Sequence, residues 1–169
     1  MATGLGMQLT GKVGEHLVTA ELARRGILAT PFSGNVPELD LLAYANTITH
    51  AIQVKTIDLN HGESWQFDIR RFLDVRKTAA GQKVLGKKKG LNRNLLCIFV
   101  ALKGPLGKAE FYVLKYGWLQ DFFAEHYRAR RPPRKVDSFH CAIRRRDMNL
   151  HLAKWNLIEL AFRIKANII

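Results

Sequence analysis

The spacing of apolar residues predicts a long helix near the start of the chain. Apolar side chains recur at helical spacing over Thr10–Arg25, and Gly26 is a typical residue at which a helix ends. One of two apolar stripes on this helix passes through Val18 and Leu22, and Glu15 lies on the same stripe at the i, i+3, i+7 spacing. Glu15 is the charged member of an otherwise apolar stripe, which makes it a candidate functional residue.

Runs of apolar and β-branched residues predict strands farther along the chain. Residues 39–45 and 48–56 are separated only by Asn46-Thr47, so they predict a hairpin. Residues 95–102 are continuously apolar, which is typical of a strand in the centre of a sheet. Further strands are expected at 27–33, 65–69 and 109–114, helices at 118–127 and 155–162, a turn at 34–37, a flexible basic loop at 81–90 and an exposed loop at 130–135.

These elements predict one α/β domain with a mixed sheet and a helix first. No internal repeat and no linker between two cores is apparent in the sequence. We expect a single domain over residues 1–169, with core motifs at 11–56, later core strands and a helix at about 95–128, and a basic C-terminal extension at 129–169.

Positive charge is concentrated after residue 56. The sequence has 27 Lys and Arg against 14 Asp and Glu, a net charge of +13, whereas residues 1–56 carry four charges of each sign. This excess predicts a polyanionic partner, because a small acidic metabolite does not require it. Two basic clusters supply the expected phosphate contacts, and they include Lys87, Lys88, Lys89, Arg93, Arg128, Arg130, Arg131, Arg134, Arg144 and Arg145.

Hydropathy and cysteine content argue against a membrane or secreted protein. The longest strongly apolar run is 95–102, far shorter than the roughly 20 residues of a spanning helix. The first residues lack the charged and apolar regions of a signal peptide. Cys97 and Cys141 are too few for a disulfide scaffold or a cysteine zinc site, so we expect a cytoplasmic protein.

A group of polar residues at the predicted strand ends suggests metal-dependent chemistry. Gln53 and Lys55 point to one face of their strand because side chains alternate, and Asp40 lies on the hairpin partner. Asp40, Glu15 and the side-chain carbonyl of Gln53 offer the oxygen ligands that Mg²⁺ prefers, or Mn²⁺ in its place. Lys55 would orient the attacking water or stabilise charge on a phosphate.

The motifs carrying these residues resemble the PD-(D/E)XK nuclease superfamily. They are the helix segment 11–18, the segment Glu38–Ala43 and the segment Ile52–Thr56, together about a third of the chain. Their order is similar to that of Holliday-junction resolvases, restriction enzymes and intron-associated homing endonucleases. The resemblance implies a restriction-endonuclease-like core, a mixed central sheet flanked by helices, and a homodimer that cuts DNA. It also implies Glu15, Asp40, Gln53 and Lys55 as catalytic residues, with the backbone carbonyl of Val54 as a further metal ligand.

Two positions depart from the superfamily pattern. Leu39 replaces the usual proline, and Gln53 replaces the usual second strand carboxylate. The loss of one negative charge at Gln53 weakens metal binding and increases the reliance on Glu15.

Two functions from different classes therefore remain open. The first is a metal-dependent DNA endonuclease, acting on branched or site-specific DNA, with RNA as an open alternative. The second is a catalytically inactive nucleic-acid-binding protein that retains the nuclease fold. In that case Lys55 extends from a strand end, Gln53 pairs with backbone and Glu15 pairs with a neighbouring basic residue.

Overall fold

The computed structural model describes residues 4–32, 39–104 and 107–164. The turn expected at 34–37 and the residue Glu38 lie outside these ranges. The chain divides into two compact units, which are described separately. Unit 1 comprises Met1–Trp65, Leu95–Leu114 and Arg144–Ile169, and unit 2 comprises Gln66–Asn94 and Lys115–Ile143.

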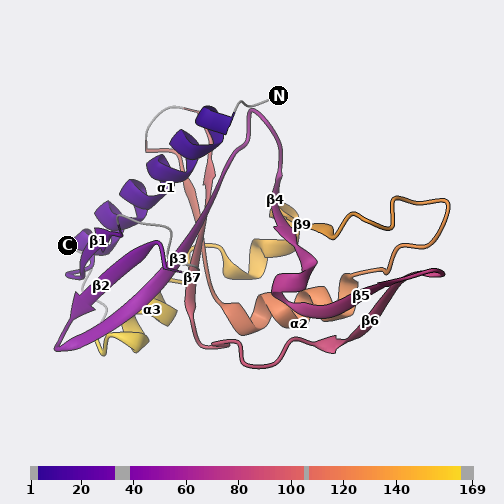
Figure 1. The fold of residues 1–169 in the computed structure, drawn as a ribbon. Coiled ribbons are helices and arrows are strands. Elements are labelled where there is room, and N and C mark those ends of the chain that lie inside the picture. Colours follow the sequence, from indigo (N-terminus) through magenta and orange to yellow (C-terminus); the bar gives the residue numbers. More distant parts are fainter. Residues whose placement is uncertain (1–3, 33–38, 105–106, 165–169) are drawn as a thin grey trace. The chain divides into compact units, whose positions relative to one another are not determined.

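Unit 1 is built on a five-stranded mixed sheet with the order β1-β2-β3-β7-β8 (Figure 1). Antiparallel pairing joins β1, β2 and β3, while β3 and β7 run parallel. The expected mixed sheet with a helix first is therefore confirmed, and the central position of the apolar strand β7 is confirmed with it. The strands are β1 (Leu28–Pro31), β2 (Leu41–Ala45), β3 (Ile48–Asp58), β7 (Leu96–Leu102) and β8 (Glu110–Lys115).

Helix α1 (Gly4–Arg24) contacts β1, β3 and β7. Its buried residues include Val18 and Leu22, so the stripe predicted from the sequence faces the sheet. The helix starts six residues before the expected Thr10, whose hydroxyl instead donates to the carbonyl of Gly6 within the helix at 2.9 Å. Its end agrees with the prediction, since Gly26 adopts a φ of 74° just beyond it.

The core of unit 1 lies on the α1 side of the sheet. Ile52 and Val54 of β3 belong to one apolar cluster with Ile98 and Val100 of β7. Helix α3 (Asn156–Ala161) also joins this cluster through Ile158, which is fully buried. The short C-terminal helix predicted at 155–162 is therefore present.

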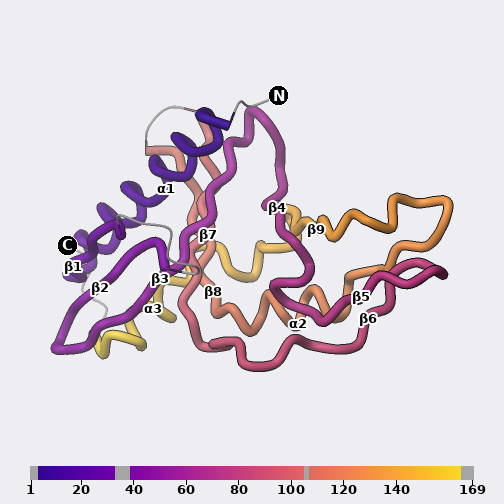
Figure 2. Tube along the Cα trace, viewed as in Figure 1, coloured from indigo at the N-terminus to yellow at the C-terminus, as the bar shows by residue number. Residues whose placement is uncertain are grey.

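Unit 2 combines α2 (Tyr116–His126) with short strands. β5 (Leu73–Thr78) and β6 (Gly81–Lys87) form an antiparallel hairpin, visible as adjacent tubes in Figure 2. The flexible loop expected at 81–90 is therefore wrong over most of its length. β4 (Ser64–Asp68) pairs with β9 (His140–Arg144), and the 3₁₀ segment η1 (Ile69–Arg71) follows β4 in the chain. A second 3₁₀ segment, η2 (Arg145–His151), follows β9 and belongs to unit 1.

An aromatic cluster forms the interior of unit 2. The ring of Phe72 stacks on Phe123 of α2 with centroids 4.7 Å apart, and it also stacks on Tyr116. Phe67 meets both phenylalanine rings edge to face. These contacts hold β4, the start of β5 and α2 together, because large rings bury much apolar area at specific geometry.

Among the helices described, none combines the length and apolar character required to cross a membrane.

Candidate active site

Asp40 lies at the start of β2, directly opposite Gln53. The last regular pair joins Leu41 to Ile52, and the Asp40 N–H donates to the carbonyl of Ile52 at 3.1 Å. One carboxylate oxygen of Asp40 also accepts a hydrogen bond from the N–H of Val54 at 2.8 Å. The sequence prediction that the hairpin brings Asp40 beside Gln53 therefore agrees with the strand register.

Gln53 and Lys55 lie on the face of β3 opposite to the core. Val54 between them faces the apolar cluster and is 6% exposed. The Gln53 side chain is 3% exposed and makes no hydrogen bond among the residues that the structure describes. The carbonyl of Lys55 accepts the indole N–H of Trp65 at 3.0 Å, which fixes the backbone of this strand end.

Beyond Gln53 one edge of β3 pairs with no strand among the residues described, and this edge is called the open edge below. β2 pairs with β3 only as far as Ile52, whereas β3 continues to Asp58 with β7 on its other side. In an extended strand the N–H and carbonyl of one residue lie on the same edge. Because the Val54 N–H bonds to Asp40, the Val54 carbonyl also lies on this open edge. A strand carbonyl and a carboxylate therefore meet there.

Glu15 follows a glycine that packs on the other face of β3. Gly14 of α1 is in close contact with Thr56, which lies on the same face of β3 as Val54. The Glu15 side chain is 13% exposed, and one of its oxygens lies 2.7 Å from the ammonium of Lys12. α1 thus covers the face of β3 opposite to the Gln53 side chain. Glu15 and Gln53 can therefore share a site only at the open edge of β3.

Unit 1 therefore brings Asp40, Gln53 and Lys55 together, with Glu15 across the sheet. Within the described ranges no three His, Cys, Asp or Glu side chains gather as a metal site. The contact between Gly14 and Thr56 cannot be predicted from the sequence, because it depends on how α1 packs on β3.

Several of the predicted DNA contacts form ion pairs with acidic residues. In unit 2, Lys87 and Arg93 both bind the carboxylate of Asp121 at 2.8 Å, and these partners lower the pKa of Asp121. In unit 1, Arg145 binds Glu110 at 2.6 Å and lowers the pKa of that carboxyl.

Arg144 likewise lies 3.1 Å from Asp147. Acidic residues of the protein itself therefore partly neutralise the charge of these four basic residues.

The other basic residues predicted to contact DNA differ in exposure and in hydrogen bonding. Lys89, Arg128, Arg131 and Arg134 have exposed side chains. The Lys88 ammonium donates to the carbonyl of Arg70 at 3.2 Å.

Arg130 is half-buried and donates to the carbonyl of His140 at 2.8 Å. Arg128 is exposed but donates to the carbonyl of Glu125 at 2.8 Å. Lys89, Arg131 and Arg134 therefore remain the best candidates for phosphate contacts from the predicted set.

Unit 2 also has an open hollow of about 710 Å³ that the sequence did not indicate. Arg70 and Arg71 of η1 line it, together with Lys88 and His140. Asp68 also lines the hollow, and its carboxylate forms an ion pair with the guanidinium of Arg70 at an N–O distance of 2.5 Å. Arg70 lowers the pKa of Asp68. The hollow is basic, although one of its cations is already neutralised.

Comparisons with known proteins show a fold but no sequence family. No protein family matches the sequence, and no curated protein is similar to it. A solved structure described as a bacterial homing endonuclease, I-Ssp6803I, aligns with a TM-score of 0.51 and 14% sequence identity. The alignment covers 89% of this chain and 91% of that one. The chain therefore shares its fold with a bacterial homing endonuclease.

Proposed function

We propose that the protein is a metal-dependent DNA endonuclease of the PD-(D/E)XK type, with Gln53 in place of the second strand carboxylate. The observation that carries the proposal is the register of β2 and β3, which sets Asp40 opposite Gln53. Lys55 follows two residues after Gln53 on β3. This arrangement occurs in a chain whose fold is that of a homing endonuclease. Fold alone does not define an activity, so the residues at the open edge of β3 must account for the chemistry.

The oxygen atoms at this edge fit a hard divalent cation. Asp40 uses one carboxylate oxygen to accept from Val54, which leaves its other oxygen for a ligand. The buried Gln53 amide has no hydrogen-bond partner in the described part of the chain, although buried amides are normally paired. Asp40, Gln53 and the Val54 carbonyl would hold Mg²⁺ or Mn²⁺, with Glu15 contributing from the α1 side. The bound ion would supply charge stabilisation at the phosphate and an acidified water.

Lys55 adds a positive charge beside these oxygen ligands. Its backbone is fixed by Trp65, and its ammonium forms no ion pair within the described residues. An ammonium in this place can donate to a phosphate oxygen and stabilise the charge that develops there. We therefore assign Lys55 the role of binding the scissile phosphate and orienting the water that attacks it.

Cleavage of supercoiled plasmid and of a four-way DNA junction, in Mg²⁺ and in EDTA, tests the proposal. Asp40→Asn and Lys55→Met should each reduce the cleavage rate by roughly 10²-fold or more and leave DNA affinity nearly unchanged. Glu63→Gln and Lys103→Met are the matched controls, because both residues are exposed and neither is assigned to this site. Equal cleavage by Asp40→Asn and its control would refute the assignment of the site.

Specific observations also support the alternative of an inactive nucleic-acid-binding protein. Gln53 is neutral, and no group of three or more His, Cys, Asp or Glu side chains gathers among the residues described. In that case the same assay would show salt-dependent DNA binding without cleavage in either metal. Sedimentation with and without DNA would test the homodimer that the family resemblance implies.

A further inference from the structure

The β5–β6 hairpin is a ribbon with one covered face and one open face. Gln82 marks the covered face and is 6% exposed. Its amide nitrogen donates to the carbonyls of Val136 and Ser138 at 2.7 and 3.0 Å, and its oxygen accepts from the Tyr127 hydroxyl at 2.6 Å. Lys77, which is paired with Gln82 across the ribbon, forms an ion pair with Asp137. The segment that follows α2 therefore covers this face at the tip of the ribbon, around Gln82.

The opposite face carries two cations side by side. Arg76 of β5 is directly opposite Lys83 of β6, and both side chains are exposed. Neither forms an ion pair or a side-chain hydrogen bond among the residues described. Like charges in directly opposite positions destabilise a strand pair. Asp74 lies two residues before Arg76 on the same strand, yet it also makes no ion pair within the described ranges. An anionic partner would remove the repulsion between the two cations.

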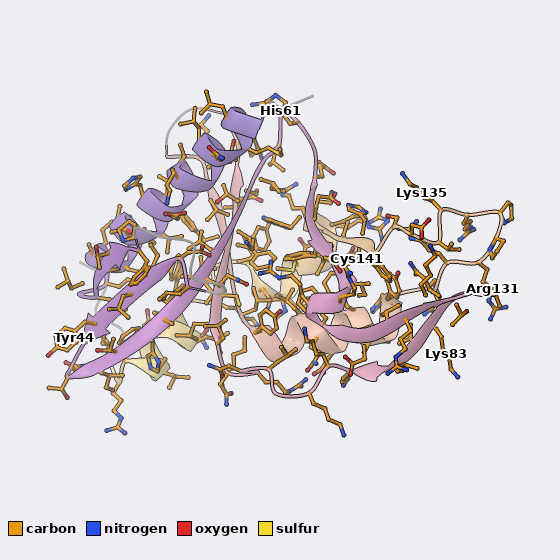
Figure 3. All side chains as sticks on the ribbon, viewed as in Figure 1. Tyr44, His61, Lys83, Arg131, Lys135 and Cys141 are labelled. Carbon is orange, nitrogen blue, oxygen red and sulfur yellow. The ribbon has the colours of Figure 1, made fainter. Side chains whose placement is uncertain are left out.

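Charge and size both favour duplex DNA as that partner. Unit 2 carries fifteen Lys and Arg against five Asp and Glu, which is +10 of the total of +13. A two-stranded ribbon is one of the elements that the major groove admits, since the strands lie about 4.8 Å apart and the groove is about 12 Å wide. Lys83 and Arg131 both lie in this unit (Figure 3), and the backbone of Arg131 is in close contact with Gly81 at the tip of the ribbon.

An extra residue on β6 gives the ribbon an apolar contact. The register shifts between Asp74 and Val75, so Leu85 has no partner on β5, and its side chain is 48% exposed. Such a bulge re-aims side chains locally. An exposed leucine on this strand can contact the methyl group that thymine presents in the major groove.

We propose that the β5–β6 ribbon enters the major groove of duplex DNA and contacts it through Arg76 and Lys83. The inference rests on the proposed function only in taking DNA as the substrate. In this proposal the ribbon contacts the major groove of the DNA. The other basic residues of unit 2 contribute electrostatic attraction to the DNA phosphates. Arg76 and Lys83 stabilise the complex by contacting base edges and the phosphates that border the groove.

Fluorescence anisotropy with two duplexes tests this contact. Both have the same sequence over about three helical turns, and in one every cytosine is replaced by glucosylated 5-hydroxymethylcytosine, whose sugar fills the major groove. EDTA is present throughout, so no cleavage occurs. The native protein should bind the glucosylated duplex roughly tenfold or more weakly than the unmodified one. The double variant Arg76→Ala, Lys83→Ala should bind both duplexes with the same, weakened affinity.

The control variant is Lys103→Ala, Lys154→Ala, which removes the same charge from exposed positions in unit 1. It should keep the preference for the unmodified duplex. Lys83→Gln provides a milder change if the double variant does not fold, which circular dichroism checks, and it should reduce the preference in part. Equal binding of both duplexes by the native protein, or an unchanged preference in the ribbon variants, would overturn the inference. Plasmid cleavage in Mg²⁺ is measured separately, so either outcome leaves the proposed nuclease activity independently testable.

Discussion

The contact between Gly14 and Thr56 predicts an unusual response to alanine. In the middle of an exposed helix, glycine is roughly 0.5–1 kcal/mol less favourable than alanine, so its replacement normally stabilises the protein. At Gly14 a new Cβ would collide with Oγ1 of Thr56 and lie 2.9 Å from both its Cβ and its Cγ2. These atoms belong to a β-branched residue on a paired strand, so they cannot move away freely.

Gly11 provides the matched control on the same helix. A Cβ at Gly11 would meet no atom within 4 Å, so Gly11→Ala should stabilise by about 0.5–1 kcal/mol. Gly14→Ala gains the same helix propensity but loses about 1–3 kcal/mol to overpacking. Urea unfolding followed by circular dichroism should therefore place Gly14→Ala about 1–3 kcal/mol below Gly11→Ala. Equal free energies of unfolding for the two variants would refute the contact.

A second substitution locates the collision. Thr56→Ala removes two of the three atoms that the new Cβ would meet. In the Gly14→Ala background it should recover part of the lost stability, and a double-mutant cycle measures this coupling. Glu15 is adjacent to Gly14, so displacement of α1 should also lower the cleavage rate, and Gly11→Ala should not.

Three further predictions concern ionisation, DNA affinity and the metal. Burial, and then the Glu110 carboxylate, raises the pKa of Tyr112 from 10 to about 12. The free energy of unfolding should therefore fall between pH 10 and 12, because the unfolded chain loses this proton at lower pH than the folded protein. Tyr112→Phe should flatten that decline in urea unfolding experiments. The slope of log K against log salt for duplex binding should be roughly −4 to −7 for four to eight phosphate contacts. Substitution of Lys87–Lys89 by alanine should flatten it by about one unit in the same titration, because Lys89 is the candidate phosphate contact among these three lysines. Gln53→Glu should tighten Mg²⁺ binding measured by calorimetry because it adds a charged ligand, and an unchanged affinity would exclude Gln53 from the site.

The hairpin at the candidate site was predictable because its signals are local. Asn46 and Thr47 adopt φ angles of 49° and 63°, which a two-residue turn between paired strands requires. Strand alternation then fixes the face of Gln53 and Lys55. The side of the sheet that α1 covers depends on packing between distant segments, so the position of Glu15 could not be derived in the same way.

The sequence predicts a loop where β6 lies because the residues of this strand lack the alternation of a half-buried strand. From Lys83 to Lys87 every side chain of β6 is exposed, so no periodic apolar face exists to be recognised. Its glycines suggested flexibility, yet Gly81 takes a φ of 116° and lies against the backbone of Arg130. The ribbon is anchored by polar contacts of Gln82, which a hydrophobic pattern does not report.

Ion pairing was a second property that the sequence did not reveal. Arg93 and Asp121 are separated by 28 residues, and Arg145 and Glu110 by 35. Both arginines were predicted as DNA contacts because their sequence neighbours offer few acidic residues. The acidic residues that pair with them come close only in the folded protein. Net charge therefore indicates the class of ligand but not which basic residue contacts it.

Asp40 has a structural and a chemical task, and the two can be separated experimentally. Its carboxylate accepts from the Val54 N–H at the end of the regular pairing, so Asp40→Ala removes a hydrogen bond as well as a charge. That loss should cost about 0.5–1.5 kcal/mol of unfolding free energy. Asp40→Asn retains an acceptor oxygen for Val54 and removes only the charge, so it should unfold like the native protein. Both variants should fail to cut DNA if the charge of Asp40 is required. Cleavage by Asp40→Asn at the native rate would mean that this residue only closes the hairpin, and the proposed metal site would lose its principal ligand.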